Sequence, residues 1–481
     1  MDERPKNLWK NVDDKYQLHV TISTIDSTIK SENVDERVVY IEDLERRRQA
    51  YGICGECKEP GTGKKWCRPC NAKRFKDNFK NWTSGNKYID EFIQQSQLNA
   101  VHYFKCLEWI PFEKFRNITY IAEGGFSKVY SVEWPEGFIE YWDIENQNWY
   151  RYKYFGKHAL KSLNNSTDIC SDFLNEIKSH LQIYLNDIVQ CFGITQDPNN
   201  KEYMMVLYYC NNGNLRNYSN ESKKYINYKS KIDKLQQIAR GLFDIHNSEI
   251  VHKDFHSGNI LLKNSYPFIS DLGMCQPANK KPSVKEEGIY GVLPFMAPEV
   301  LRGYQYTKAA DIYSFGIIMS EFLSGEIPFN DIPHDEFLAI KICKGLRPTI
   351  SKDLPKSFAD LIIKCLDAEI KNRPTTKELY QQLKKWSNEI KSKNSEIYFQ
   401  VKECDKIREE KFKNRPNEDK SNMNTTHPQA FYTSRLLNFK NLPEPVNSSD
   451  LSSFQFSSDA NYTTQSTSSN PISECLDYRI K

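Results

Sequence analysis

The chain has 481 residues, of which 39% are hydrophobic and 27% charged, so it is long enough for roughly three folded units. Its 66 Lys and Arg residues against 63 Asp and Glu residues give a net charge of +3, so bulk charge does not point to a nucleic-acid partner. The absence of an apolar run of ~18 residues excludes a membrane-spanning helix, and 13 cysteines without an apolar leader favour the cytoplasm, with the nucleus as the alternative.

The first part of the chain divides into two segments. Residues 1–50 are polar and irregular, and we expect a flexible segment that becomes helical over Val34–Gln49. Residues 51–112 begin with a cluster of cysteines. Behind that cluster, four apolar residues recur at helical spacing and predict a short amphipathic helix: Ile89, Phe92, Ile93 and Leu98.

The cysteine cluster consists of two Cys-x-x-Cys pairs. Cys54 and Cys57 are followed, after nine residues, by Cys67 and Cys70. Thiolates at this spacing can close a tetrahedral site around Zn²⁺, so we predict a small zinc-ribbon-like fold with a structural role. Four reduced cysteines without metal are the alternative. The basic stretch Asn71–Lys76 suggests nucleic-acid binding, which is a less favoured interpretation than docking on the rest of the chain or on a partner.

Strand-like segments begin beyond residue 112. Ile121–Tyr130 predicts a strand, a turn of small residues and a second strand, in which backbone N–H groups could approach phosphates. Ala122 and Ser127 replace two of three expected glycines, so an ordinary hairpin is the alternative. The next strand places Lys161 inward after an apolar pair, where its ammonium group needs an anionic partner. Glu176, on an expected helix, is a candidate for that partner.

A second group of polar residues follows two later strands. Asp254 and Asn259 lie five residues apart in the loop within Ile250–Leu262, and Asp271 follows the next strand, just before Gly273. Mg²⁺ prefers such oxygen ligands together with substrate phosphates. Phosphoryl transfer requires a phosphate cover, a lysine, metal ligands and a base aimed at the nucleophile.

In this order the motifs resemble those of the eukaryotic protein kinase family. The motifs that carry the resemblance are the Gly-rich turn, Lys161, Glu176, His252-Lys253-Asp254 with Asn259, Asp271-Leu272-Gly273, Ala297-Pro298-Glu299, Asp311–Gly316 and Asn372-Arg373-Pro374. The resemblance implies an α+β fold of two lobes over residues 113–386, with a small antiparallel β-sheet lobe and a larger helical lobe. We also expect the region from Trp82 to Trp109 to pack against the small lobe.

The resemblance further implies ATP and Mg²⁺ as cofactors and protein hydroxyl groups as substrates. Lys161 would hold the α- and β-phosphates and pair with Glu176, Asp254 would accept the substrate proton, and Asn259 and Asp271 would hold Mg²⁺. The expected ATP-binding residues are Ala122, Glu123, Gly124, Gly125, Phe126, Ser127, Val129, Ala159, Lys161, Leu207, Tyr208, Cys210 and Leu261.

Assignment to a particular group within the kinase family rests on fewer residues. Gly291–Glu299 and the His-Lys-Asp loop are most similar to the tyrosine-kinase-like group, which implies serine and threonine acceptors, with tyrosine as the alternative. The cysteine pairs are similar to cysteine-headed segments ahead of kinase domains in expanded fungal kinase families. Lys253 replaces the usual arginine and lacks its fork geometry, while His256 and Val292 also depart from common patterns. A pseudokinase scaffold that recruits signalling partners is therefore the alternative function.

The final segment, residues 387–481, is predicted as a charged helix to about Phe412 followed by a disordered tail. Residues 447–473 contain ten Ser and three Thr among 27 residues, with few apolar groups to offset the ordering entropy. Tyr432–Phe439 is locally apolar. We interpret it as a collapsed patch, with docking on a partner as the alternative. Ser283 and Tyr290, in the loop before Gly291, are candidate phosphorylation sites, although a solvated loop residue without a role is the favoured interpretation of each.

Overall fold

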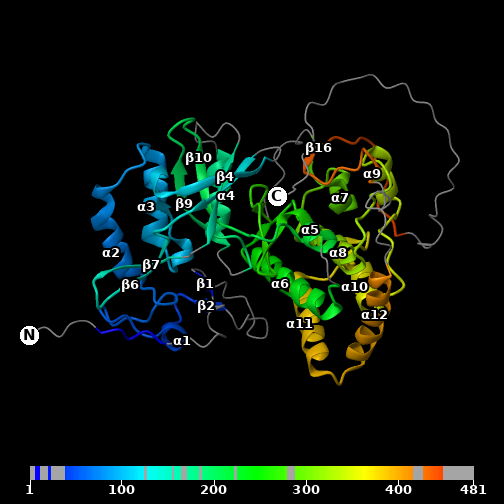
Figure 1. Ribbon diagram of the computed structural model, residues 1–481, viewed down its shortest axis with the longest axis horizontal. Coiled ribbons are helices and arrows are strands. Elements are labelled where there is room, and N and C mark those ends of the chain that lie inside the picture. The colour runs from blue at the N-terminus through cyan, green and yellow to red at the C-terminus, as the bar shows by residue number, and fades with distance from the viewer. Residues whose placement is uncertain are drawn as a thin grey trace, which may run out of the picture.

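The structure is a computed structural model that describes residues 6–10, 20–22, 38–123, 127–153, 156–163, 171–183, 187–221, 225–278, 288–414 and 426–447. The described residues form a mainly β lobe and a larger helical lobe, with helices α2 (Arg68–Asn78) and α3 (Lys87–Asn99) on the side of the β lobe that faces away from the helical lobe (Figure 1). The two-lobed α+β fold predicted from the sequence is confirmed. Among the helices formed by the described residues, none is both long and apolar enough to cross a membrane.

The β lobe is built on a six-stranded sheet in the order β3-β9-β10-β8-β5-β4. Its strands are β3 (Glu108–Trp109), β4 (Arg116–Glu123), β5 (Ser127–Glu133), β8 (Lys157–Leu163), β9 (Cys191–Gln196) and β10 (Tyr203–Tyr208). The β3–β9 pairing is parallel and the other four are antiparallel. β8 and β10 are buried along nearly their whole length, which matches the continuous apolar sequence of β10, whereas β8 also buries polar residues such as Lys161.

A helix and a hairpin complete the β lobe. Helix α4 (Ser171–Gln182) packs on the sheet through Phe173 and Ile177, which have no exposed surface. The hairpin β6 (Phe138–Asp143) and β7 (Asn148–Tyr152) is inserted between β5 and β8. The carboxylate of Asp143 accepts two backbone N–H groups of its turn, at 3.1 and 3.2 Å, as is typical of aspartate in turns.

The N-terminal segment contains β1 (Val20–Ile22), β2 (Val38–Tyr40), α1 (Leu44–Tyr51), α2 (Arg68–Asn78) and α3 (Lys87–Asn99). The expected helix over Val34–Gln49 begins only at Leu44. The β-branched pair before it forms β2, which is parallel to β1, and Asp43 caps the helix by accepting the N–H of Arg46 at 2.9 Å. The amphipathic helix expected behind the cysteines is α3.

The helical lobe is organised around two long helices, α6 (Tyr228–Asn247) and α8 (Lys308–Ser324). α8 is buried on nearly all sides and ends at Gly325, whose φ of 75° suits a left-handed cap. The other helices are α5 (Leu215–Glu221), α7 (Pro298–Leu301), α9 (Glu336–Cys343), α10 (Lys356–Cys365), α11 (Thr376–Ser392) and α12 (Glu396–Lys413). Short 3₁₀ turns in the same lobe are η6 (Ser257–Asn259), η7 (Leu293–Phe295) and η8 (Ile370–Asn372). Those that precede β4 in the chain are η3 (Phe79–Asn81), η4 (Tyr103–Lys105) and η5 (Phe112–Lys114).

Short strand pairs connect these helices and place loops at the front of the lobe. They are β11 (Ile250–Val251) with β14 (Gln276–Pro277), β12 (Ile260–Lys263) with β13 (Tyr266–Ile269), and β15 (Ile289–Gly291) with β16 (Arg435–Leu437). The charged helix expected after residue 387 corresponds to the end of α11 and to α12. The tail predicted as disordered lies outside the described residues at 415–425 and 448–481. Residues 426–447 of the tail lie on the helical lobe, where β16 joins β15 (Figure 1).

Candidate active site

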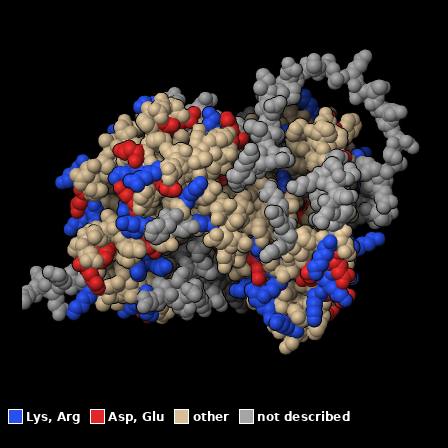
Figure 2. Space-filling view, viewed as in Figure 1, with Lys and Arg blue, Asp and Glu red and all other residues tan. Residues whose placement is uncertain are grey.

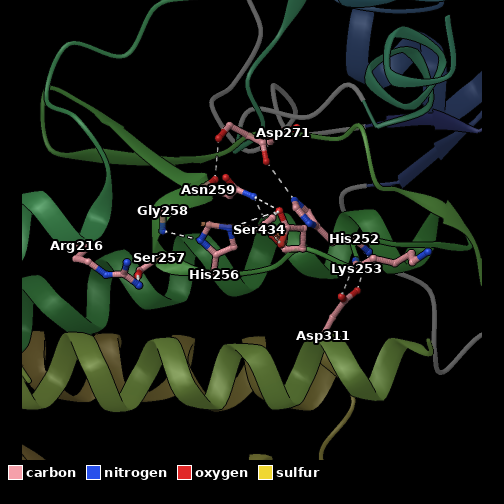
Figure 3. A network of polar contacts seen from close by, with 12 residues as sticks. Arg216, His252, Lys253, His256, Ser257, Gly258, Asn259, Asp271, Asp311 and Ser434 are labelled. Atoms are coloured by element: carbon pink, nitrogen blue, oxygen red, sulfur yellow. Dashed lines mark hydrogen bonds and ion pairs between the residues drawn. The ribbon is translucent and has the colours of Figure 1, made fainter. Parts of the chain in front are cut away.

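The loop between β11 and β12 is held by Asp311 of α8, a residue with no exposed surface. Its carboxylate accepts the backbone N–H groups of His252 and Lys253 at 2.8 and 3.1 Å (Figure 3), and Nε2 of His246 lies 2.9 Å away. Lys253 has a φ of 69°, in the left-handed region that costs energy for a residue with a side chain. The buried carboxylate therefore stabilises a strained turn immediately before Asp254.

Asp254, which is 7% exposed, is surrounded by hydrogen-bond donors from its own loop. Nδ2 of Asn259 lies 2.9 Å from the backbone oxygen of Asp254 and 3.1 Å from its Oδ2. Nε2 of His256 lies 3.5 Å from the same Oδ2. The N–H of Gly258 lies 3.1 Å from Nδ1 of His256, and this contact orients the ring with Nε2 towards Asp254. The loop therefore orients this carboxylate from two sides.

A hydroxyl group from the tail also reaches Asp254. Ser434 Oγ lies 2.6 Å from both Oδ1 and Oδ2 and donates its hydrogen to the carboxylate (Figure 3). Burial opposes the charge of Asp254, but the charge and hydrogen bond of His256, followed by the hydroxyl of Ser434, hold its pKa below the ordinary range. Asp254 is therefore ionised at neutral pH and can accept a hydroxyl proton.

Lys161 of β8 lies between two carboxylates. Its Nζ is 2.7 Å from Oε1 of Glu176 on α4 and 3.0 Å from Oδ1 of Asp271, which follows β13. Glu176 is 1% exposed, so the ion pair with Lys161 is buried within the β lobe. Asp271 has a φ of 58°, another left-handed conformation at a residue with a side chain. These contacts connect the sheet, α4 and the loop after β13.

The charges in this group influence one another. Burial disfavours the charged form of Lys161, but Asp271 and Glu176 outweigh it and raise the pKa of Lys161. The charge of Lys161 in turn lowers the pKa of Asp271. Burial raises the pKa of Glu176, although Lys161 acts in the opposite direction. Lys161 therefore remains protonated beside Asp271, an arrangement suited to phosphate groups and a divalent cation.

The apolar residues predicted to surround adenine belong to one hydrophobic cluster: Val129, Ala159, Leu207, Tyr208, Cys210 and Leu261. Leu207 is 8% exposed and pairs with Ala159 across β10 and β8. The N–H of Tyr208 donates to the oxygen of Gln190 at 2.9 Å. An adenine contact at Tyr208 would therefore use its carbonyl oxygen.

The Gly-rich turn joins β4 to β5, where Ala122 pairs with Val129. Glu123 ends β4 and Ser127 begins β5. Gly124, Gly125 and Phe126, which were predicted to cover the phosphates, lie outside the described residues.

A buried ion pair braces the helical lobe behind the site. Nη1 and Nη2 of Arg373 lie 2.6 and 2.8 Å from the two carboxylate oxygens of Glu299, and Nε donates to the oxygen of Asp367 at 2.8 Å. The side chain of Arg373 has no exposed surface. The fork geometry holds α7 against the turn that precedes α11.

Some residues near Asp254 were not assigned from the sequence. Nε of Arg216 on α5 donates to Glu321 at 2.7 Å, Nη2 donates to Ser257 at 3.0 Å, and the guanidinium group lies 4.3 Å from the ring centre of Tyr432. Ser434 is 180 residues from Asp254 in the sequence. No short motif marks either Arg216 or Ser434, since each depends on where a distant segment runs.

The four clustered cysteines of the N-terminal segment come together in space. The sulfur atoms of Cys54, Cys57, Cys67 and Cys70 all lie within 4.8 Å of one another, and none of the four is in a disulfide. A backbone turn and the start of a helix position the two pairs of cysteines. The N–H of Lys58 donates to the oxygen of Cys54 at 3.0 Å, and α2 begins directly after Cys67. Four sulfur ligands at this spacing are compatible with a tetrahedral zinc site.

The pKa values of the thiols in this cluster favour binding of a cation. The hydrogen bond from Cys67 lowers the pKa of Cys54 to about 5, so one thiolate forms readily. Burial and then the negative charge of Cys54 raise the pKa of Cys70 to about 12. The cluster therefore resists a second charge unless a cation neutralises it, and Zn²⁺ coordinates deprotonated thiolates.

The cysteine cluster packs on the β6–β7 hairpin of the β lobe. Trp66, wholly buried beside Cys67, lies 6.0 Å from Trp149 of β7, and Phe75 of α2 stacks on Trp149 at 4.7 Å between ring centres. The guanidinium group of Arg74 lies 4.3 Å from the ring centre of Trp142. On the face shown in Figure 2, basic and acidic side chains are interspersed over this part of the molecule.

Two lobes, a buried lysine–glutamate pair and a loop aspartate braced from a central helix together define a protein kinase domain. A model of the protein tyrosine and serine/threonine kinase family matches residues 115–383, and the chain belongs to that family.

Curated proteins similar to the chain carry kinase names. The serine/threonine-protein kinase VIK of Arabidopsis thaliana is 29% identical over 281 residues, which cover 56% of this chain and 60% of that protein. The RGS domain-containing serine/threonine-protein kinase A of Dictyostelium discoideum is 30% identical over 253 residues, 49% of this chain and 22% of that protein. The putative serine/threonine-protein kinase/receptor R831 of Acanthamoeba polyphaga mimivirus is 34% identical over 219 residues, 44% of this chain and 12% of that protein. The chain thus spans less than two thirds of each relative's length.

Proposed function

We propose that this chain is an ATP- and Mg²⁺-dependent protein kinase that transfers the γ-phosphate to serine and threonine hydroxyl groups. The observation that carries the proposal is the buried contact of Lys161 with Glu176 at 2.7 Å and with Asp271 at 3.0 Å. A lysine in this position can bind phosphate oxygens while a carboxylate beside it holds a metal ion. The kinase names of the similar proteins support the same activity.

The proposed roles of the site residues are as follows. Asp254 accepts the proton of the substrate hydroxyl, and His256 positions its carboxylate. Lys161 holds the nontransferred phosphates and is itself held by Glu176. Asn259 and Asp271 are the residues that would bind Mg²⁺, which when bound neutralises charge on the phosphates. The apolar cluster around Leu207 and the Gly-rich turn would bind adenine and phosphates, respectively.

Serine and threonine are the preferred acceptors in this proposal, with tyrosine as the alternative. The relatives are named as serine/threonine kinases. The Gly291–Glu299 sequence agrees with membership of the tyrosine-kinase-like group, and we retain that grouping. A cytoplasmic location, protein substrates and a signalling partner that docks on the cysteine cluster or on the tail belong to the same proposal. The interspersed charges in Figure 2 favour a protein over a nucleic acid as that partner.

A pseudokinase scaffold is the competing function. Catalytically silent kinase folds arise when a phosphate-binding or metal-binding group is lost, and here all five groups are retained: Lys161, Glu176, Asp254, Asn259 and Asp271. The replacement of the usual arginine by Lys253 removes no group that contacts ATP. Its Nζ lies 3.3 Å from Oε1 of Gln276. The retained set favours the enzyme.

The test is transfer of radiolabelled phosphate from ATP to a library of mixed peptides. We expect the purified chain to label serine and threonine peptides. Asp271→Asn should abolish labelling because the amide is a weaker Mg²⁺ ligand, while the exposed Asp360→Asn on α10 should retain it. Wild-type protein that melts cooperatively but labels no peptide would overturn the enzyme in favour of the scaffold.

We also propose a structural Zn²⁺ bound by Cys54, Cys57, Cys67 and Cys70. The common 4.8 Å neighbourhood of their sulfur atoms supports it, as does the resistance of the cluster to a second uncompensated charge. Protein purified without chelators should contain about one zinc per chain by elemental analysis. Cys57→Ser should lower that content, whereas Cys404→Ser, on α12, should leave it unchanged. Zinc-free wild-type protein would reject the site.

A further inference from the structure

The tail segment, defined as residues 426–447, lies on the helical lobe in front of the loop between β11 and β12, which carries Asp254. Its first half is fixed by His334. The backbone N–H of His334 donates to the oxygen of Gln429 at 2.9 Å, and its Nδ1 lies 2.9 Å from the oxygen of Phe431. The imidazole ring also packs edge-on against Tyr432, at 4.8 Å between ring centres. These contacts give this half of the segment a defined path.

Tyr432 is the aromatic anchor of the segment. Its hydroxyl group donates to the oxygen of Pro328 at 2.7 Å, and its ring lies under the guanidinium group of Arg216 at 4.3 Å. Arg216 is itself fixed by Glu321 at 2.7 Å, and the side chain of Glu321 is only 5% exposed. A cation held in place above an aromatic ring is a specific contact that a collapsed patch would not require.

Backbone pairing fixes the register beyond Ser434. β16 is antiparallel to β15, with Arg435 opposite Gly291 and Leu437 opposite Ile289. Leu437 is 5% exposed and belongs to the main hydrophobic core, whereas its neighbour Leu436 is 50% exposed. The strand therefore presents alternate side chains to the lobe and to solvent, as a bound extended peptide does.

The last residues of the segment are bound as well. The N–H of Val446 donates to the oxygen of Cys343 at 2.9 Å. Asn447 accepts the N–H of Ala368 and donates to Asp367, both at 2.8 Å. Contacts on both sides of Ser434 thus align one hydroxyl group with the catalytic carboxylate, whose two oxygens lie 2.6 Å from Ser434 Oγ (Figure 3).

We propose that the tail segment occupies the protein-substrate groove of its own kinase domain, and that Ser434 is the residue that this domain phosphorylates in cis. This inference rests on the proposed kinase activity and names its first substrate. Ser434 Oγ attacks the γ-phosphorus of ATP, forming an O–P bond while the bond from that phosphorus to the β,γ-bridging oxygen breaks. ADP leaves with the bond's electron pair, and the hydroxyl proton passes to Asp254.

The same geometry defines a preferred substrate class. The acceptor is a serine with an aromatic residue two positions before it, bound by Arg216, and an aliphatic residue three positions after it, bound in the core position of Leu437. While Ser434 carries no phosphate, the segment competes with other protein substrates. Phosphorylation adds about two negative charges beside the Asp254 carboxylate, and like-charge repulsion then favours release of the segment.

The first experiment measures phosphorylation of the full chain by mass spectrometry after addition of Mg-ATP. We expect phosphate on Ser434, at a first-order rate that is unchanged over about a hundredfold dilution, because the acceptor is intramolecular. Ser434→Ala should lose this phosphate, and the exposed neighbour variant Thr433→Ala should keep it. A rate proportional to protein concentration, or phosphate only at other sites, would overturn the cis assignment.

A peptide library run in parallel separates the two levels of the proposal. Labelled library peptides together with unmodified Ser434 would overturn this inference and leave the kinase activity standing. If neither the library peptides nor Ser434 receives phosphate, the kinase activity itself is overturned.

The second experiment releases the segment without touching Ser434. Leu437→Asp places a charge in the core position and should lower the dissociation constant for an exogenous serine peptide by about tenfold, since a tethered competitor at high effective concentration is removed. Binding is measured with Mg²⁺ and a nonhydrolysable ATP analogue, so that Ser434 stays unphosphorylated in every protein. Leu436→Asp is the matched control, because that side chain is half exposed, and its dissociation constant should equal that of the wild type. Equal dissociation constants for all three proteins would show that the groove is not occupied by the tail. Should Leu437→Asp fail to fold, Tyr432→Ala provides the same comparison by removing the aromatic anchor.

Discussion

At the residue scale, the most informative contact is that between His256 and Asp254. The sequence marks His256 only as a departure from common kinase patterns, but the structure places its Nε2 3.5 Å from the carboxylate of Asp254, the residue that we propose as the base. Through this contact His256 positions the Asp254 carboxylate and favours its ionised form.

We predict that His256→Ala shifts the pH dependence of the kinase. Asp254 has a depressed pKa, so it is ionised, and active as a base, down to low pH. Removing the charge and hydrogen bond of His256 raises that pKa towards the ordinary range. The acidic limb of the kcat/KM profile should therefore move to higher pH, with little change above neutrality. An acidic limb that stays in place while activity falls equally at every pH would indicate a merely structural histidine.

The Glu299–Arg373 pair gives a second prediction, on stability. Glu299→Ala leaves a guanidinium group with no exposed surface and without its carboxylate, which should cost about 3–5 kcal/mol of unfolding free energy in a urea titration. Lys308→Ala removes one partner of an ion pair whose side chains are 36% and 71% exposed, and should cost less than about 1 kcal/mol. Similar losses in the two variants would contradict the assignment of Arg373 as a buried brace.

Residues of the candidate site differ in how far the sequence could identify them. Lys161, Asp254, Asn259 and Asp271 lie in separate short motifs, each on a single strand or loop, so local sequence was sufficient to select them. Ser434 contacts Asp254 across 180 residues of chain. Its role depends on the path of the tail, where the sequence suggested disorder and a collapsed apolar patch, with docking on a partner as the alternative.

At the scale of elements, helix α3 of the N-terminal segment supports the helix that carries Glu176. Ile89 and Ile93 of α3 have no exposed surface and share one hydrophobic cluster with Phe173 and Ile177 of α4. The sequence predicted α3 from its apolar periodicity, a helix around Glu176, and packing of residues 82–109 on the small lobe, but it did not identify α4 as the helix that α3 contacts. Because Glu176 lies on the same turn of α4 as Ile177, this packing influences the Lys161–Glu176 contact.

We predict that Ile93→Ala lowers both stability and activity. Removing the buried side chain should cost about 2–5 kcal/mol and should loosen α4, so kcat should fall while the KM for peptide changes little. Tyr88→Ala, at a position that is 75% exposed on the same helix, should change neither. The two variants are compared by melting temperature and by steady-state kinetics. A normal kcat in a destabilised Ile93→Ala protein would show that α3 stabilises the lobe without positioning Glu176.

The element that sequence reasoning placed least well is the helix expected over Val34–Gln49. Charged residues with scattered apolar ones resemble a helix locally, but Val38-Val39-Tyr40 pairs with β1 as a strand, and the helix begins after Asp43. Strand pairing depends on a partner about 18 positions away in the chain, as in the Val20–Val38 register. A local pattern could not reveal that partner.

At the scale of the whole molecule, the cysteine segment packs directly against the kinase domain. Trp66 and Phe75 from the cysteine segment stack with Trp149 of the inserted hairpin, and α3 continues from this contact to α4. The bound zinc that we propose would therefore stabilise the surface on which the β lobe rests. Loss of the metal should then affect activity at a distance from the site.

We predict that removal of zinc lowers kinase activity through this connection. A chelator should extract about one zinc per chain, and the cysteine segment should then lose its fold because the cluster cannot retain several thiolates uncompensated. Fluorescence of Trp66 and Trp149 should change as their stacking is lost. Activity should fall at least about tenfold, which corresponds to ~1.4 kcal/mol in barrier height, and should return when Zn²⁺ is added back. Cys57→Ser should reproduce the loss without chelator, while Cys404→Ser treated in the same way should behave as the wild type. Full activity in zinc-free protein with altered tryptophan fluorescence would show that the cysteine segment folds independently of catalysis.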